Sequence, residues 1–232
     1  MIDLNTLNDK QREAVTYHEG PMLILAGAGS GKTRVLTHRI AYLIQHYQVR
    51  PYEILALTFT NKAAKEMRQR VDSMVGFGSD AIWVTTFHAT CVRFLRRFID
   101  EIGYDRSFAI YDTEDQRTMI REIMKQQNVD TSKIKDRAVA RAISNAKNQM
   151  IDSVQYEAEF GFSYPESEYA SLYKAYQQRL FQNNALDFDD LLFKTVELFK
   201  ACPEVLAGYQ ERFKYIMVDE YQDTNNAQFE LV

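Results

Sequence analysis

A glycine-rich loop lies between an apolar run and a helical pattern near the start of this chain, and it constrains the fold more than any other feature. The loop is "AGAGSGKT" at residues 26–33, preceded by "MLIL" and followed by "RVLTHRIAYLI". Backbone N–H groups of such a turn at a helix N-terminus form a nest for an anion, and the helix dipole favours negative charge there. This spacing would bring the Lys32 ammonium to the outer phosphates of a nucleotide and the Thr33 hydroxyl to Mg²⁺. The sequence therefore predicts a phosphate-binding loop.

The loop departs from the usual pattern at one position. That pattern begins with glycine six positions before the lysine, where this chain has Ala26. A strand-to-helix turn that binds no ligand is the alternative interpretation. The Gly-Lys-Thr triplet between a strand and a helix favours phosphate binding.

Alternation of strands and helices predicts an α/β fold. Four short runs rich in aliphatic or β-branched residues are typical of buried strands, and each of the first three leads into a helical pattern. The runs are "MLILAG", "ILALTFT", "AIWVTTF" and "YIMVDE". Such an order predicts a parallel sheet with right-handed crossovers. Residues from about 109 to 200 show helical periodicity without a convincing strand, which predicts a helical insertion.

An acidic segment could complete the phosphate site. In "YIMVDEYQD", Asp219 leaves the fourth apolar run and would hold Mg²⁺, usually through water, while Glu220 would take a proton from the attacking water. Acidic pairs at strand ends are common, so this interpretation depends on their meeting Lys32 and Thr33. Together these four residues predict hydrolysis of a nucleoside triphosphate, with positioning and charge neutralisation doing most of the catalysis.

Composition excludes several classes of protein. With 232 residues, 46% hydrophobic and 26% charged, the chain is long enough for one domain with an insertion or for two small domains, and it is neither disordered nor fibrous. It has no secretory leader pattern and no apolar run that could span a bilayer, so we expect a cytoplasmic location. Cys91 and Cys202 are far apart and are expected to be ordinary reduced thiols.

Charge is distributed unevenly along the chain. The net charge of −4 argues weakly against a surface covered with basic residues. Residues 117–147 are nevertheless basic, and residues 152–190 are acidic. Solvated helix faces are the simplest explanation of both runs, and a binding patch is the alternative.

Six motifs follow one another along nearly the full chain. They are "LNDKQ", "AGAGSGKT", "LTFTNKAAKEM", "TTFHA", "LDFDDLL" and "VDEYQDTN". In this order they resemble the motifs of the UvrD/Rep/PcrA type of superfamily 1 DNA helicases. The resemblance implies a RecA-like P-loop NTPase sheet flanked by helices, with an all-helical inserted subdomain. Residues 1–108 and 186–232 would form an incomplete domain 1A, and residues 109–185 would form domain 1B.

The resemblance also implies roles at an ATP site. Gln11 would recognise adenine, because its amide can both donate and accept a hydrogen bond. Gln222 would sense the γ-phosphate and the attacking water, and Asp223 would join the same network. The catalytic set is then Lys32, Asp219, Glu220 and Gln222, with Thr33 and Asp219 at the metal. The expected nucleotide-binding residues are Gln11, Ala26, Gly27, Ala28, Gly29, Ser30, Gly31, Lys32, Thr33 and Arg34.

Single-stranded DNA is the second expected ligand. In the family, "FTNKAA" and "TFHA" contact the strand on the face opposite ATP. Phe59 would offer a stacking surface and Lys62 a phosphate contact. Phe87 is expected to be part of the core. The other expected contacts are polar and are Thr60, Asn61, Thr86 and His88. The basic run in domain 1B could face a duplex junction or a single strand.

The helicases of the UvrD/Rep/PcrA type, which this sequence resembles, are ATP-dependent 3′-to-5′ DNA helicases of repair or replication. Their later motifs and second RecA-like domain are absent from this sequence, so we expect an N-terminal fragment that does not unwind DNA alone. Charge stabilisation by arginines of that second domain would be missing. Two alternatives stay open: a nucleotide- and DNA-binding module without turnover, and a subunit of a helicase–nuclease.

Overall fold

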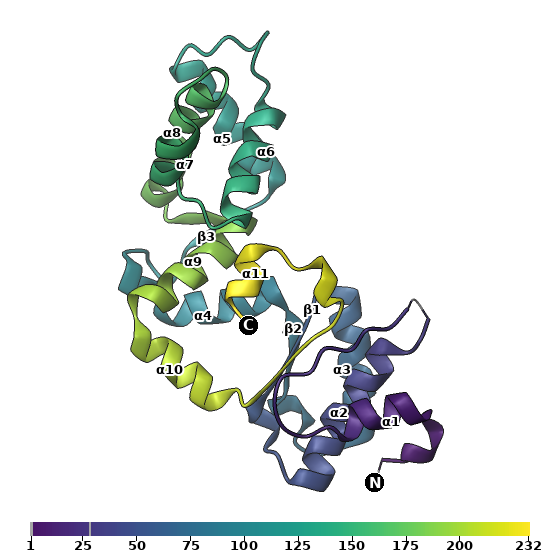
Figure 1. Ribbon diagram of the computed structural model, residues 1–232. Coiled ribbons are helices and arrows are strands. Elements are labelled where there is room, and N and C mark those ends of the chain that lie inside the picture. Colours follow the sequence, from purple (N-terminus) through teal and green to yellow (C-terminus); the bar gives the residue numbers. More distant parts are fainter. Residues whose placement is uncertain (1, 28) are drawn as a thin grey trace. The chain divides into compact units, whose positions relative to one another are not determined.

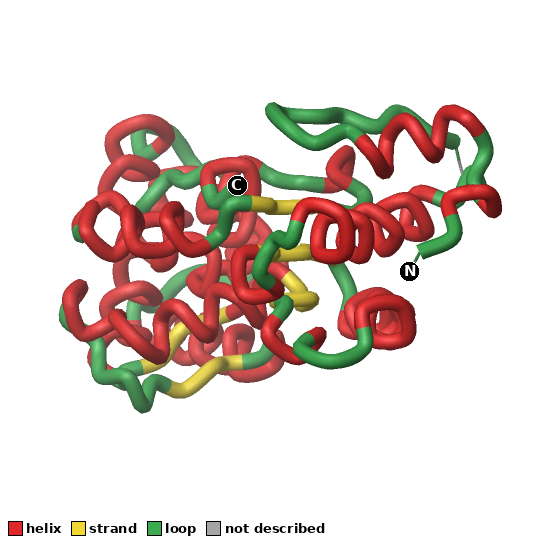
Figure 2. Tube along the Cα trace, turned by 90° about the horizontal axis from the view of Figure 1, so that it is seen from below, coloured by secondary structure: helices red, strands yellow, loops and turns green. Residues whose placement is uncertain are grey.

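The computed structural model describes residues 2–27 and 29–232, whose contacts form two compact units (Figure 1). The first unit contains the chain up to Phe87 together with Ala207–Asp223, and the second contains His88–Leu206 together with Thr224–Val232. The boundaries predicted for domains 1A and 1B remain predictions. Helices make up most of the chain, with short strands among them (Figure 2).

A parallel sheet of three strands forms the centre of the first unit. Its order is β2 (Trp83–Thr86), β1 (Ile54–Thr58), β5 (Tyr215–Val218), and all five residues of β1 are buried. In register, Leu55 of β1 lies opposite Trp83 of β2 and Ile216 of β5. A central strand covered on both faces is expected to be apolar throughout, as "ILALT" is. The predicted α/β fold with a parallel sheet and flanking helices is therefore confirmed.

The helices of the first unit begin and end where the sequence signals them. Thr60 caps the N-terminus of α3 by accepting a hydrogen bond from the Ala63 N–H at 3.1 Å. Buried aliphatic side chains of α2 and α3, such as Ile40 and Met67, pack in one cluster with Ile54 of β1. The helices are α1 (Asp9–Thr16), α2 (Lys32–Tyr47) and α3 (Asn61–Val75).

The segment "MLILAG" was predicted as a strand, and this prediction is wrong. Residues 21–27 lie outside the sheet, and Leu23 and Leu25 are 68% and 87% exposed. Ile24 between them packs against the small cluster of Leu7, Val15 and Val35. An apolar run supplies side chains for a strand but does not specify a partner for its backbone groups, and here only one residue in two is turned towards a core.

The second unit is mostly helical. Aliphatic and tyrosine side chains from α5 (Thr113–Gln126), α6 (Asp136–Asn148) and α8 (Glu166–Gln182) form one core of this unit, in which Tyr176 and Val139 are fully buried. The helix α10 (Pro203–Arg212) leads the chain back to the first unit. The other helices are α4 (Phe87–Phe98), α7 (Ser153–Phe160), α9 (Phe188–Ala201) and α11 (Asn226–Glu230).

The region predicted to be all-helical contains two strands, which corrects the prediction. β3 (Ala109–Tyr111) and β4 (Ala185–Asp187) pair in parallel, with Ile110 opposite Leu186. Strands of three residues are too short to show a repeat of two, so their periodicity could not be seen in the sequence. None of the helices in the described ranges combines the length and the apolar composition that a bilayer span requires.

Candidate functional site

The glycine-rich loop enters α2 through backbone angles that favour glycine. Gly29 and Gly31 have φ values of +74° and +89°, in the left-handed region. Gly31 is the N-cap of α2 and has no side chain with which to accept a hydrogen bond from the first turn. A Cβ atom at position 31 would also lie 3.0 Å from Gln11 Nε2. The backbone N–H groups at the start of α2 are therefore available to donate hydrogen bonds to an anion.

Gln11 lies against this loop. Its Nε2 donates to the Ser30 carbonyl at 2.9 Å, and its Oε1 accepts from the Asn8 N–H at 3.1 Å. The loop is braced by the Ser30 hydroxyl, which donates to the Gly27 carbonyl at 2.7 Å. Gln11 thus contacts the glycine loop with both ends of its amide engaged by the protein, and its expected role at adenine remains a prediction. Ala28, also expected to bind nucleotide, lies outside the described residues.

The loop and the acidic strand end meet across 188 and 186 residues of sequence. Lys32 Nζ lies 2.8 Å from Glu220 Oε2, and the Thr33 hydroxyl donates to Asp219 Oδ2 at 3.0 Å. Asp219 is buried directly after β5, where its N–H donates to the Leu57 carbonyl at 3.0 Å. The parallel pairing of β5 with β1 therefore fixes the position of this carboxylate.

Glu220 is the centre of a small polar network. Its φ is +53°, and besides Lys32 it accepts a hydrogen bond from Gln222 Nε2 at 2.6 Å. The Lys32 hydrogen bond, followed by that of Gln222, holds the pKa of Glu220 below its usual range. The same bond to Glu220 raises the pKa of Lys32. Asp223 lies 3.5 Å from Gln222 Nε2 and completes the network.

A cavity of about 480 Å³ opens at these residues, within the range of small-ligand pockets. Its lining contains predicted nucleotide-binding residues and one residue that the sequence analysis missed, Arg70 of α3. No hydrogen bond or ion pair within the described ranges engages the Arg70 side chain. The neighbouring cation Arg34 donates to the Thr6 carbonyl at 3.0 Å. The lining residues are Gly27, Gly29, Gly31, Lys32, Thr33, Arg34, Arg70 and Glu220.

Oxygen atoms near this cavity fit magnesium bound together with phosphate. Thr33 Oγ1 and Asp219 Oδ2 lie 3.0 Å apart. Among residues 2–27 and 29–232 there is no group of three or more His, Cys, Asp or Glu side chains that could hold a metal ion. Mg²⁺ commonly takes only one or two protein oxygens and completes its shell with water and substrate phosphates. The donors present therefore suit Mg²⁺ that arrives with a nucleotide.

Comparison with known proteins assigns this sequence to a family. The family model for the UvrD/REP helicase N-terminal domain matches residues 7–232. The chain belongs to this family. It is 52% identical over 229 residues to the ATP-dependent DNA helicases PcrA of Staphylococcus aureus and of Bacillus subtilis, and 52% identical over 231 residues to that of Staphylococcus epidermidis. Each alignment covers 99% of this chain and 31% of the relative.

The residues that this UvrD/REP domain was expected to use for DNA differ in their exposure. Phe59 is partly exposed and packs at 5.6 Å, ring centre to ring centre, on the buried Phe87. Thr86 is buried in β2. The residues after Phe59, namely Thr60, Asn61 and Lys62, are exposed at the start of α3. A surface at Phe59 is therefore available to a ligand, whereas Thr86 lies within the fold.

His88 belongs to the second unit. Its ring lies edge-on to that of Phe188, 6.1 Å away between centres. Burial lowers the pKa of His88, against the weaker opposing effect of Asp189. Any contact made by His88 near neutral pH is consequently that of a neutral imidazole.

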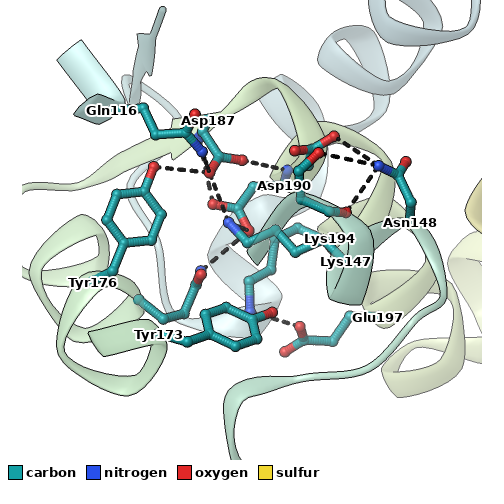
Figure 3. Close-up of polar contacts among 12 residues, drawn as sticks. Gln116, Lys147, Asn148, Tyr173, Tyr176, Asp187, Asp190, Lys194 and Glu197 are labelled. Atoms are coloured by element: carbon teal, nitrogen blue, oxygen red, sulfur yellow. Dashed lines mark hydrogen bonds and ion pairs between the residues drawn. The ribbon is translucent and has the colours of Figure 1, made fainter. Parts of the chain in front are cut away.

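A buried ionic cluster in the second unit was not foreseen (Figure 3). Lys147 is 1% exposed, and its Nζ lies 2.8 Å from Asp187 Oδ2 and 2.9 Å from Asp190 Oδ1. Tyr176 donates its hydroxyl proton to Asp187 at 2.9 Å, and Gln177 donates to Asp190 at 3.1 Å. These charges lie in the runs that were interpreted as solvated helix faces, so for them that interpretation is wrong.

Each charge in this cluster changes the pKa of the others. Burial is the largest effect on Asp187 and acts to raise its pKa, but the charge and hydrogen bond of Lys147, together with hydrogen bonds from the Asp190 N–H and Tyr176, lower that pKa overall. Burial and then the charge of Asp187 raise the pKa of Asp190 to about 6. Burial opposes the charged form of Lys147, yet the two carboxylates raise its pKa to about 12. A signal for this cluster was present in "LDFDD", where carboxylates interrupt an apolar run.

Proposed function

We propose that this chain forms the ATP- and single-stranded-DNA-binding part of an ATP-dependent DNA helicase that moves 3′ to 5′ in repair or replication. The observation that carries the proposal is the meeting of the glycine loop with the acidic strand end, through Lys32–Glu220 at 2.8 Å and Thr33–Asp219 at 3.0 Å. Membership of the UvrD/REP family supports it, as do relatives that are named ATP-dependent DNA helicases.

Residues of the first unit would bind the nucleotide. Backbone N–H groups at the start of α2 would donate hydrogen bonds to the phosphates, and Lys32 would exchange Glu220 for a γ-phosphate oxygen. Bound Mg²⁺ would neutralise phosphate charge, with Thr33 and Asp219 as its protein ligands. Gln11 and Arg34 would lie beside the adenine base of the nucleotide. Gln11 already contacts the glycine loop, and Arg34 contacts the segment before α1.

Glu220 would act as the general base towards water. Once Lys32 binds phosphate, the Glu220 carboxylate loses the contact that lowers its pKa most. Gln222, which donates to Glu220 at 2.6 Å, would orient both the carboxylate and the attacking water. Asp223 would hold Gln222 in place. These residues would supply positioning and charge, which dominate catalysis of phosphoryl transfer.

A strand of DNA would bind beside α3. Phe59 would stack on a base, and Asn61 and Lys62 would contact the sugar–phosphate backbone. Stacking tolerates any sequence, so such a grip suits an enzyme that moves along DNA. A second RecA-like domain, which the family resemblance implies, would complete this scheme.

Substitution of Lys32 tests the nucleotide site. Lys32→Ala should raise the Kd for a fluorescent non-hydrolysable ATP analogue by about 10–100-fold, because a charged hydrogen bond contributes about 1.5–3 kcal/mol. Lys65→Ala is the matched control, since Lys65 is an exposed lysine of α3 outside the cavity lining. Equal affinity of the Lys32→Ala variant and the unaltered chain would contradict the role of this loop.

Turnover separates a motor domain from a binding module that does not hydrolyse ATP. ATP hydrolysis by the chain, stimulated by single-stranded oligonucleotide, would support a motor domain. Tight binding of both ligands without detectable phosphate release would support the alternative, a binding module that does not turn over ATP. Both measurements use the same purified protein.

A further inference from the structure

The chain passes from the first unit to the second directly behind the candidate catalytic residues. Gln222 and Asp223 are the last residues of the first unit's C-terminal segment, and Thr224 begins that of the second. Asn225 follows and is the N-cap of α11. Only one residue therefore separates the network around Glu220 from the start of a helix in the other unit.

Asn225 uses both ends of its side chain. Its Oδ1 accepts from the Gln228 N–H at 2.9 Å, which caps α11, while Gln228 Oε1 accepts from the Asn225 N–H at 3.0 Å. Its Nδ2 donates to Oδ1 of Asn148 at the end of α6. One atom of the amide thus serves the cap, and the other joins α11 to α6.

Asn148 carries this connection to α9 (Figure 3). Its Nδ2 donates to the Ser144 carbonyl at 2.8 Å and to Asp189 Oδ1 at 3.3 Å. Asp189 follows Phe188, whose ring meets His88. Hydrogen bonds therefore connect α11 through α6 to Asp189 of α9, and the neighbouring Phe188 contacts His88, a residue expected to contact DNA.

We propose that Asn148 and Asn225 are positioning residues, and that their hydrogen bond couples nucleotide binding to DNA binding. This inference rests on the proposed function. When phosphate draws Lys32 away from Glu220, the Gln222–Glu220 bond changes, and the backbone at Gln222–Asp223 shifts with it. Because α11 is tied to Asn148, that shift is passed to α9 and the residues packed on it. A ligand can bias another site only through such a difference between states.

Other contacts hold α11 in place when this bond is removed. Ala227 is buried, and Lys200 of α9 lies 3.3 Å from Glu230. Asn225→Ser keeps a side-chain oxygen for the cap and removes only the donor to Asn148, because serine caps helices as well as asparagine. Asn148→Ala removes the acceptor from the opposite side. Asn145→Ala is the control, since Asn145 is exposed on the same helix.

The test is the ratio of two nucleotide affinities for the full 232-residue chain. The Kd of a fluorescent non-hydrolysable ATP analogue is measured without and with saturating oligo-dT. In the unaltered chain and in Asn145→Ala we expect this ratio to differ from one by at least fivefold, the lower end of usual allosteric coupling. Asn225→Ser and Asn148→Ala should each bring the ratio at least threefold closer to one. Each should keep its thermal midpoint within about 2 °C and its separate affinities within about twofold of the unaltered chain. The double variant should add little to either single change.

Each result decides a different question. An unaltered chain that binds neither ligand would overturn the proposed function as a whole. An unaltered chain that binds both with a ratio of one, or variants whose ratio equals that of the unaltered chain, would overturn the link alone. The two substitutions alter opposite ends of one bond, so either folded variant is sufficient for this decision.

Discussion

Replacement of Lys147 by methionine should strongly destabilise the second unit. Methionine nearly matches the length of the lysine side chain and removes its charge. The Asp187 and Asp190 carboxylates would then remain buried with no cation between them, although Lys147 Nζ now lies 2.8 and 2.9 Å from their oxygens. Removal of one partner from a buried ion pair typically costs about 3–5 kcal/mol. We expect a loss of this size in the free energy of unfolding at pH 7.

The free energy of unfolding lost in Lys147→Met should be smaller at pH 5 than at pH 7. Without Lys147, both carboxyl groups lose the largest effect that opposes burial, so burial raises the pKa of each of them further. A carboxyl group whose pKa is raised by folding contributes stability that is present below its unfolded pKa and is lost as the pH rises through its folded pKa. Acid therefore restores part of the stability by neutralising the unpaired groups. The difference between the unaltered chain and Lys147→Met should narrow from pH 7 to pH 5.

Urea unfolding followed by far-UV circular dichroism measures both effects. Lys133→Met is the control, because Lys133 is 68% exposed and lies 3.7 Å from Asp130, an arrangement that contributes at most about 1 kcal/mol. Adding Asp190→Asn to Lys147→Met should recover stability by removing one unpaired charge.

Trp83 packs on Phe213 in the first unit, so its fluorescence reports on that unit separately. If Lys147→Met lowers the free energy of unfolding by less than about 1 kcal/mol at pH 7, or by more at pH 5 than at pH 7, the role assigned to the buried Lys147 is refuted.

Two further predictions concern ligand binding. Arg70→Ala should raise the Kd for an ATP analogue about tenfold, because Arg70 lines the cavity, its guanidinium has no hydrogen bond or ion pair to any described residue, and it suits phosphate oxygens. Fluorescence titration with Lys65→Ala as control checks this, and an unchanged Kd would exclude Arg70 from the nucleotide site. Phe59→Ala should weaken oligo-dT binding about tenfold, because stacking contributes about 1–3 kcal/mol per base, while ATP-analogue affinity stays constant. Loss of both affinities would show instead that the contact of Phe59 with Phe87 is needed for folding.

Elements with a long or regular pattern were predictable from the sequence. The apolar faces of α2 and α3 repeat over four turns, and the run "ILALT" is buried at every position of β1. The predictions failed where the formation of a strand depends on which other segment pairs with it. β3 and β4 have three residues each and exist because Ala109 and Ala185 come side by side. The run "MLILAG" has strand composition, yet Leu23 and Leu25 face solvent because the segment pairs with no strand of the described chain.

The candidate site shows the same division. Motif order was enough to expect that Lys32 and Thr33 would meet Asp219 and Glu220, and the structure brings them within 3.0 Å. Arg70 could not be found in this way, because its place at the cavity follows from the packing of α3 rather than from any spacing. Lys147 was hidden for a different reason. A lysine within a basic run is expected to be solvated, and only the fold shows that buried carboxylates lie beside Lys147.

In the proposed mechanism, the Lys32–Glu220 pair would link the strength of Glu220 as a base to the presence of substrate. A carboxylate whose pKa is lowered by an ammonium is a weaker base than a free one. The hydrogen bond from Lys32 is the largest cause of the low pKa of Glu220, and the same bond raises the pKa of Lys32 and so keeps it protonated. Phosphate oxygens would compete with Glu220 for that ammonium. As they succeed, Glu220 would become a stronger base when a phosphoryl group is in place, and the proposed mechanism would activate water only where there is a substrate for it to attack.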